Sequence, residues 1–184
     1  NFKVTAVFVD QDFIDIEPGD TTAFRYGIAY DLGTTTVVAT LLDLNTGTPL
    51  AVKSILNKQQ PFGADVITRI SATMLDPAAL EKLSSLAQET LNQLTQEVCI
   101  EAGVDPLHVY EIAIAGNATM NQLLLGIDPE PLGVAPFIMA AADFPDVDAV
   151  DIGIHIHPRA NAVILPSLGA YVGGDIIAGA LASG

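Results

Sequence analysis

One hairpin near the start of the chain constrains its fold more than any other feature. An apolar strand, Gly27–Tyr30, ends at Asp31, and a second strand begins at Val37 after a very short connection. Gly33 lets the backbone turn tightly and lets a ligand approach without a Cβ in the way. Three hydroxyl groups and three backbone N–H groups follow in a row, from Thr34, Thr35 and Thr36.

This turn has two readings. In the first it directs several donors at a phosphate chain, and Asp31 holds a hydrated Mg²⁺ ion, which keeps most of its waters and takes one or two carboxylates. In the second it is an ordinary hairpin turn, because Asp, Gly and Thr are common in turns for local reasons. The stretch matches neither the Walker-type loop nor the Rossmann glycine pattern.

The charge balance narrows the classes of ligand. Acidic residues outnumber basic ones 22 to 7 among 184 residues, for a net charge of −15. Nucleic acids and anionic membranes both need a basic face, so neither is expected as a partner. With so few cations, a phosphate ligand would have to be held by backbone amides, hydroxyl groups and a metal ion.

The single cysteine, Cys99, can form no internal disulfide and can hold neither an iron–sulfur cluster nor a structural zinc ion alone. We expect it to be a small core residue in a reducing, cytoplasmic environment. No signal peptide and no uncharged apolar run of membrane-spanning length is present. Because the last predicted helix stops at Gly184, the chain is expected to be a piece of something longer.

Residues 1–25 read as an entry segment, either the tail of a linker or an edge element of the main domain, with a strand over Val4–Val9 and an acidic, turn-like stretch over Asp10–Asp15. Three strands with short connections then predict an antiparallel meander. They cover Tyr26–Tyr30, Val37–Leu44 and Leu50–Leu56.

Helices and further strands follow the meander. One helix is expected from about Ala64, and a longer one follows the break at Asp76-Pro77 and ends at Gly103. Its apolar residues recur at spacings of three and four, which predicts a buried stripe. The stripe is Leu80, Leu83, Ala87, Leu91, Leu94 and Val98. Strands are predicted over Val109–Ala115 and Ala162–Leu165, each leading towards a further helix.

Two polar turns lie between a strand and a helix, a common ligand position in α/β folds. Asn117 follows the first strand, and it is either a helix cap or a ligand contact. Gly173 and Gly174 precede the last helix and allow a ligand to approach closely. Asp175 at the start of that helix is either a cap or a catalytic carboxylate.

The stretch 127–158 predicts a loop with some irregular strand, in which His155 and His157 would share one strand face. A metal pair there would need further ligands, and no companion is evident.

The element order β-β-β-α-β-α-β-α predicts an α/β lobe with a mixed five-stranded sheet and helices on both faces. Together with Asp-x-Gly-Thr-Thr in the first hairpin, it resembles the ribonuclease H-like lobe of the actin, sugar kinase and heat-shock chaperone superfamily. Residues 26–184 would be the first lobe of such an ATPase, truncated in its last helix.

Four short sequence motifs narrow the resemblance to one family within this superfamily. In order they are Tyr26-Gly-Ile-Ala-Tyr-Asp-Leu-Gly-Thr-Thr-Thr36, Gly63-Ala-Asp-Val-Ile-Thr-Arg-Ile70, Gly116-Asn-Ala-Thr-Met120 and Val172-Gly-Gly-Asp-Ile-Ile-Ala-Gly179. Together they resemble the ATP-dependent reductive activators of corrinoid proteins, which serve corrinoid methyltransferases and O-demethylases.

The resemblance implies a larger, homodimeric parent. It would carry a [2Fe-2S] domain outside this sequence and use ATP to drive an electron to cob(II)alamin in a corrinoid protein partner. By the same resemblance Asp31 is the Mg²⁺-water ligand and Gly33 with Thr34–Thr36 the phosphate cradle. Asn117, Gly173 and Gly174 line the cleft, and Asp175 orients or deprotonates the attacking group.

Two other functions stay open on the sequence alone. The lobe could be a docking or dimerisation module for a corrinoid protein that has lost nucleotide use. It could also belong to a small-molecule kinase of the same superfamily, which would need an acceptor-binding loop near Asp175.

Overall fold

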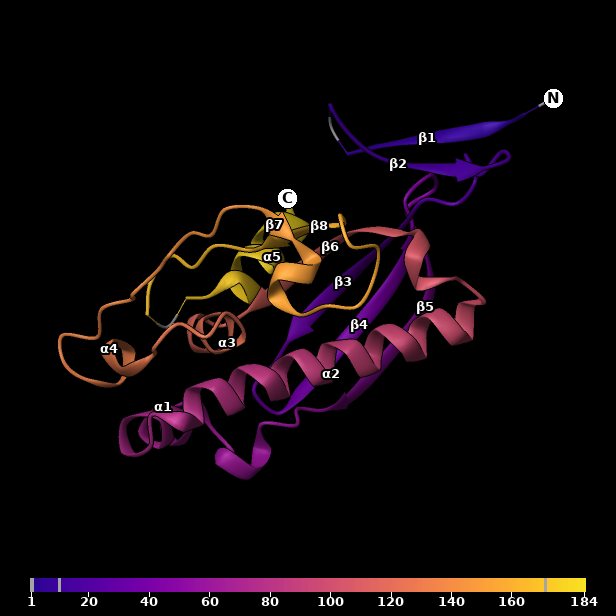
Figure 1. Cartoon of the computed structure of the whole chain (residues 1–184). Coiled ribbons are helices and arrows are strands. Elements are labelled where there is room, and N and C mark those ends of the chain that lie inside the picture. Colours follow the sequence, from indigo (N-terminus) through magenta and orange to yellow (C-terminus); the bar gives the residue numbers. More distant parts are fainter. Residues whose placement is uncertain (1, 10, 171) are drawn as a thin grey trace.

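The computed structural model describes residues 2–9, 11–170 and 172–184, so Asn1, Asp10 and Tyr171 lie outside the described residues (Figure 1). Its strands are β1 (Val4–Val9), β2 (Asp12–Pro18), β3 (Tyr26–Leu32), β4 (Thr36–Asp43), β5 (Thr48–Leu56), β6 (Val109–Gly116), β7 (Val147–Asp148) and β8 (Asn161–Ile164). Its α-helices are α1 (Val66–Leu75), α2 (Ala78–Ala102), α3 (Ala118–Leu124), α4 (Glu130–Gly133) and α5 (Gly174–Ser183).

Six of these strands form the central sheet of the described chain, in the order β5-β4-β3-β6-β8-β7. Strands β3, β4 and β5 are the predicted antiparallel meander, while β6 runs parallel to both β3 and β8. Leu32, the last residue of β3, pairs with Val37 on one side and with Gly116 on the other. The carboxyl ends of β3, β6 and β8 therefore meet at one edge of the sheet.

The core lies between the sheet and α2. Alternate residues of β3, such as Ile28, Tyr30 and Leu32, are almost fully buried on this face, as the twofold repeat of a strand requires. The predicted stripe of α2 packs on them, all of it buried except the partly buried Leu80. The Tyr30 hydroxyl is 2.6 Å from the Thr95 hydroxyl of α2, which satisfies both buried polar groups.

Several predictions about individual elements are confirmed. Helix α2 ends at Gly103, which adopts φ 68°, a left-handed conformation that glycine reaches without a Cβ penalty. Cys99 is buried in the core and burial raises its pKa to about 11, so it is a packing residue. Helix α5 packs against β6, and its residues do not belong to the hydrophobic core between α2 and the sheet. The α/β class is confirmed, with β7 as one short edge strand beyond the expected five.

Two local predictions were wrong. The described part of the stretch from Asp10 to Asp15 is not simply a turn, because from Asp12 onward it belongs to β2, which pairs with β1 and leaves Asp12 exposed. His155 and His157 do not share a strand face, because this segment is irregular. The backbone N–H of His155 donates to Asn92 of α2 at 2.7 Å, whereas the His157 ring turns towards Asp15 at 3.2 Å.

Candidate functional site

The candidate site is the turn 33–35 between β3 and β4, together with the segments that follow β6 and β8. Gly33 is required there by packing, because a Cβ on it would lie 2.3 Å from the Thr36 carbonyl oxygen. The side chains of Thr35 and Thr36 are exposed, and that of Thr34 is half-buried. The turn thus presents its hydroxyl groups at the carboxyl edge of the parallel strands, where ligands of open α/β sheets bind.

The backbone carbonyl groups of Gly33, Thr34 and Thr35 each accept a hydrogen bond from another part of the protein. The Asn57 side chain donates through Nδ2 to the Gly33 carbonyl at 2.9 Å, and the Asn57 backbone N–H donates to the Thr35 carbonyl at 2.9 Å. Arg69 donates through Nη2 to the Thr34 carbonyl at 2.6 Å. Since the carbonyls accept on the protein side, no acceptor of the turn needs a partner from a ligand.

The backbone N–H groups of the turn behave differently. Within the described residues, the N–H groups of Gly33, Thr34 and Thr35 donate to no protein acceptor. Three consecutive amides with free donors form the kind of concavity that binds anions. The free amides agree with the reading of the turn as a donor site, and phosphate binding there stays a prediction.

Asn117 is the helix cap that the sequence allowed, and its contact with a ligand stays a prediction. Its Oδ1 accepts from the Met120 N–H at 3.0 Å, which caps α3. Its Nδ2 donates to the Thr34 hydroxyl oxygen at 3.1 Å, which ties the β6–α3 turn to the β3–β4 turn. One side chain thus joins the carboxyl ends of two neighbouring strands.

The two candidate carboxylates, Asp31 and Asp175, act on each other across the site. Burial, and then the negative charge of Asp175, raise the pKa of Asp31. Asp175 is not the cap of α5, because that position belongs to Gly173. It is exposed in the first helical turn, and its Oδ1 accepts from the Ile176 N–H at 2.8 Å. Two mutually repelling carboxylates beside free amides form a donor set suited to a hydrated Mg²⁺ ion and a phosphate chain.

The donor set does not suit a metal held by protein ligands alone. Among the described residues, no group of three or more His, Cys, Asp or Glu side chains gathers to hold a metal ion. Mg²⁺ is the cation that fits, because it keeps most of its waters and shares its remaining ligands with phosphate oxygens.

Gly173 and Gly174 have a packing role. A Cβ on Gly173 would lie 2.4 Å from the Asn117 Cα, and a Cβ on Gly174 would lie 2.7 Å from the Leu165 Cβ. These glycines let the start of α5 lie directly against the backbone that follows β6 and β8. They bring Asp175 to the site, and direct ligand contact by either glycine stays a prediction.

A cavity of about 370 Å³ adjoins the turn. Thr34, Thr35 and Asn117 line its polar side, and Val66 and Ile70 of α1 belong to its apolar wall. A polar rim next to an apolar wall is the usual composition of a small-molecule site.

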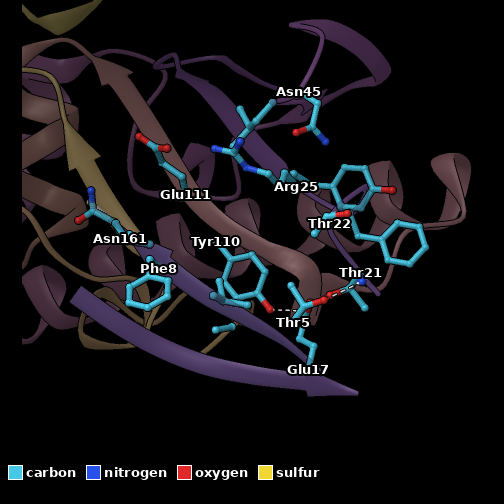
Figure 2. A pocket seen from close by; sticks show the side chains of 16 residues that line it. Thr5, Phe8, Glu17, Thr21, Thr22, Arg25, Asn45, Tyr110, Glu111 and Asn161 are labelled. Atoms are coloured by element: carbon cyan, nitrogen blue, oxygen red, sulfur yellow. Dashed lines mark hydrogen bonds between the residues drawn. The ribbon is translucent and has the colours of Figure 1, made fainter. Parts of the chain in front are cut away.

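A larger cavity, of about 520 Å³, lies at the opposite edge of the sheet, between the β1–β2 hairpin and the amino ends of β3, β6 and β8 (Figure 2). Its most buried polar group is the carboxylate of Glu17, which accepts hydrogen bonds from the Tyr110 and Thr21 hydroxyl groups. His108 lies 3.5 Å from the same carboxylate. This cavity is a polar junction between the hairpin and the lobe, remote from the turn 33–35.

Sequence reasoning missed the residues that support the site from within. Arg69 stands inside the second of the four family-like motifs, where it was given no role, and Asn57 lies outside all four. Both act on backbone carbonyl groups, which leave no mark in the sequence. A basic residue at a buried helical position of an acidic chain was the available signal for Arg69.

The fold and the site together define an α/β lobe of the kind found in actin-like ATPases. The RACo middle region family matches residues 26–184, and the chain belongs to this family. Within the described residues, no helix combines the length and apolarity that a bilayer span requires.

Two relatives are similar over most of the chain. The corrinoid activation enzyme RamQ of Eubacterium limosum is 39% identical over 153 residues, which is 83% of this chain and 26% of that protein. The solved structure of a reductive activator for corrinoid, iron-sulfur protein matches with a TM-score of 0.88 and 40% identity, over 92% of this chain and 27% of that one. The chain therefore spans about a quarter of the length of the relatives it matches.

Proposed function

We propose that this chain is the nucleotide-binding lobe of an ATP-dependent reductive activase for a corrinoid protein. One observation carries the proposal: three free amide donors in the turn 33–35 lie beside a carboxylate pair, Asp31 and Asp175, whose mutual repulsion a cation would relieve. The names of the two relatives, a corrinoid activation enzyme and a reductive activator, support the substrate class.

In this function the turn receives the phosphate chain. The free N–H groups of residues 33–35 and the hydroxyl groups of Thr34, Thr35 and Thr36 donate to phosphate oxygens. Asp31 holds a Mg²⁺ ion through its water shell, and the ion supplies charge neutralisation for the phosphates when it is bound. Asp175 orients or deprotonates the attacking group. Asn117 fixes the Thr34 hydroxyl, while Gly173 and Gly174 keep α5 close enough for Asp175 to take part.

The redox step belongs to the larger protein. A [2Fe-2S] domain outside this sequence would supply one electron, cob(II)alamin in the corrinoid protein would accept it to give cob(I)alamin, and ATP binding and hydrolysis would supply the driving force. The corrinoid protein is the partner, and neither nucleic acid nor a membrane is expected. A homodimeric parent stays a prediction of the family resemblance, and a cytoplasmic location stays a prediction from the single cysteine.

Calorimetric titration of MgATP into the natural full-length protein tests the proposal, with Asp31→Ala as the variant. We expect about tenfold or greater loss of affinity, because Asp31 is the proposed holder of the hydrated ion. Asp12→Ala is the matched control, since Asp12 is an exposed carboxylate of the β1–β2 hairpin at the opposite edge of the sheet. Equal affinities for all three proteins would contradict the nucleotide role.

Reduction of cob(II)alamin, followed by absorbance on a purified corrinoid protein, tests the activation role separately. We expect it to require ATP and to be lost in Asp31→Ala. Activation of the same rate without ATP would contradict the coupling.

A further inference from the structure

Arg69 of α1 is the most unusual buried residue of the lobe. Its side chain is 0% exposed. Beyond the bond to the Thr34 carbonyl, its guanidinium donates through Nη1 to the Gln59 Oε1 at 2.8 Å and through Nε to the Gly63 carbonyl at 3.1 Å. All of these acceptors are uncharged.

No acidic group compensates the Arg69 charge directly. Among the described residues, none of the ion pairs includes Arg69. Burial lowers the pKa of Arg69, and the charge of Asp65 opposes this effect only in part. Burying a cation without a paired anion is costly, and an apolar side chain could fill the same volume. Packing alone therefore does not explain an arginine at this position.

The position of the Arg69 charge, next to the turn 33–35, suggests what the charge does. Arg69 contacts the back of the turn 33–35, whose front carries the free N–H groups, in a protein with a net charge of −15. Of the basic side chains in the described chain, Arg69 is the one whose head group bonds to this turn. An anion at the front of the turn would supply the missing negative charge.

We propose that Arg69 is a positioning residue for phosphate binding: it pulls the Thr34 carbonyl to the back of the turn, and it provides a fixed positive charge behind the amides that face the phosphate. The inference deepens the proposed function and rests on it for the identity of the ligand. Arg69 does not touch the phosphate itself, because the turn lies between them.

Lysine would not replace arginine in this role. The planar guanidinium reaches three acceptors through three different nitrogen atoms: Gln59 and Gly63 at the two ends of one short loop, and Thr34 in the turn. An ammonium group has one nitrogen and no fork, so it keeps the charge and loses most of the geometry. Arg69→Lys and Arg69→Met therefore separate the contribution of geometry from that of charge.

The experiment titrates three probes into the natural full-length protein and its variants: MgATP, magnesium pyrophosphate and adenosine. We expect Arg69→Met to weaken MgATP and pyrophosphate binding by about 10- to 100-fold, because the Thr34 carbonyl loses the donor that positions it and the phosphate loses a nearby positive charge. Arg69→Lys should recover part of this loss. Adenosine affinity should stay within about twofold in both variants, since Arg69 acts on the phosphate end.

A control variant separates this role from general destabilisation. Ser84→Ala removes a buried hydrogen bond of α2, from the Ser84 hydroxyl to the Leu124 carbonyl at 2.9 Å, without touching the turn. It should lower the melting temperature and leave all three affinities unchanged. Arg69 variants that lose phosphate and adenosine binding equally, or that lose neither, would overturn the positioning role.

Binding by the unmodified protein distinguishes failure of the nucleotide function from failure of the positioning role of Arg69. Binding of pyrophosphate without any preference for MgATP would contradict the nucleotide function, while the Arg69 variants would still test positioning on pyrophosphate. Failure of the unmodified protein to bind either phosphate probe would overturn both.

Discussion

The hydroxyl group of Tyr110, at the start of β6, donates a hydrogen bond to the buried carboxylate of Glu17, which lies 93 residues earlier in the chain. This bond, drawn in Figure 2, ties the β1–β2 hairpin to the lobe, together with His108 at 3.5 Å from Glu17 and His157 at 3.2 Å from Asp15. Arg159 adds another tether by donating through Nη1 to the Phe13 carbonyl at 2.9 Å, and otherwise the two strands of the hairpin pair chiefly with each other. Polar tethers of this kind hold an orientation without building a shared core.

Tyr110→Phe should release the hairpin. The change leaves the buried Glu17 carboxylate without one of its donors, which costs about 1–3 kcal/mol. We therefore expect limited proteolysis of residues 19–25 to accelerate by about tenfold, with the melting temperature of the lobe little changed. Tyr26→Phe is the control, because Tyr26 stacks on Phe24 through its ring. Equal cleavage rates in the two variants would show that the Glu17 bond does not hold the hairpin.

Asp31→Asn should stabilise the ligand-free protein while it removes Mg²⁺-dependent binding. Burial and Asp175 raise the pKa of Asp31, so the folded state holds this proton to a higher pH than the unfolded state does. The Asp31 charge therefore lowers stability as pH rises above about 4. After solvent screening the gain at pH 7 should be at most about 1 kcal/mol, and it should vanish at pH 3.

Denaturant unfolding of both proteins at pH 7 and pH 3, without divalent cations, measures this difference. A loss of stability at pH 7 would contradict the repulsion between Asp31 and Asp175.

Asn117 offers a test that separates its two hydrogen bonds. Asn117→Asp keeps an oxygen that caps α3 and loses the Nδ2 donor to Thr34. We expect unfolding free energy within about 0.5 kcal/mol of the unmodified protein but several-fold weaker MgATP binding. Asn117→Ala should lose about 1 kcal/mol as well, because it also removes the cap. Identical MgATP affinity in Asn117→Asp would contradict a role for the Thr34 contact in the site.

Leu91→Ala should destabilise the lobe severely. Leu91 is 0% exposed at the centre of the α2 stripe, and removing such a side chain leaves a cavity that costs about 2–5 kcal/mol. Ile100→Ala on the same helix is the control, since Ile100 is 80% exposed and its loss should cost less than about 0.5 kcal/mol. Thermal denaturation compares the two, and similar melting temperatures would contradict the packing of α2 on the sheet.

The parts predicted best from sequence are those that local periodicity determines. The α2 stripe, the three meander strands and the Gly103 stop follow from spacings of two or of three and four, and from one residue that tolerates a left-handed backbone. Strand β2 was not predicted, because its aspartates suggested a turn. Its strand conformation depends on pairing with β1, which the local sequence does not reveal.

Only the side of the site that would face the ligand was predictable from the sequence. The turn 33–35 is recognisable from its residue types, and the strand order predicts that the segments after β6 and β8 reach the same edge. The rear of the site depends on Arg69 and Asn57 reaching carbonyl oxygens across 35 and 24 residues of chain. Such contacts depend on tertiary geometry, since every residue offers the same carbonyl group.

Strand β6 joins the two polar regions of the molecule. Tyr110 near its start holds the hairpin, and Asn117 directly after its end holds Thr34. Eight residues of extended strand span roughly 25 Å, and a strand hydrogen-bonded on both sides neither stretches nor bends easily. β6 therefore keeps the candidate phosphate turn and the attachment point of the hairpin at a fixed separation.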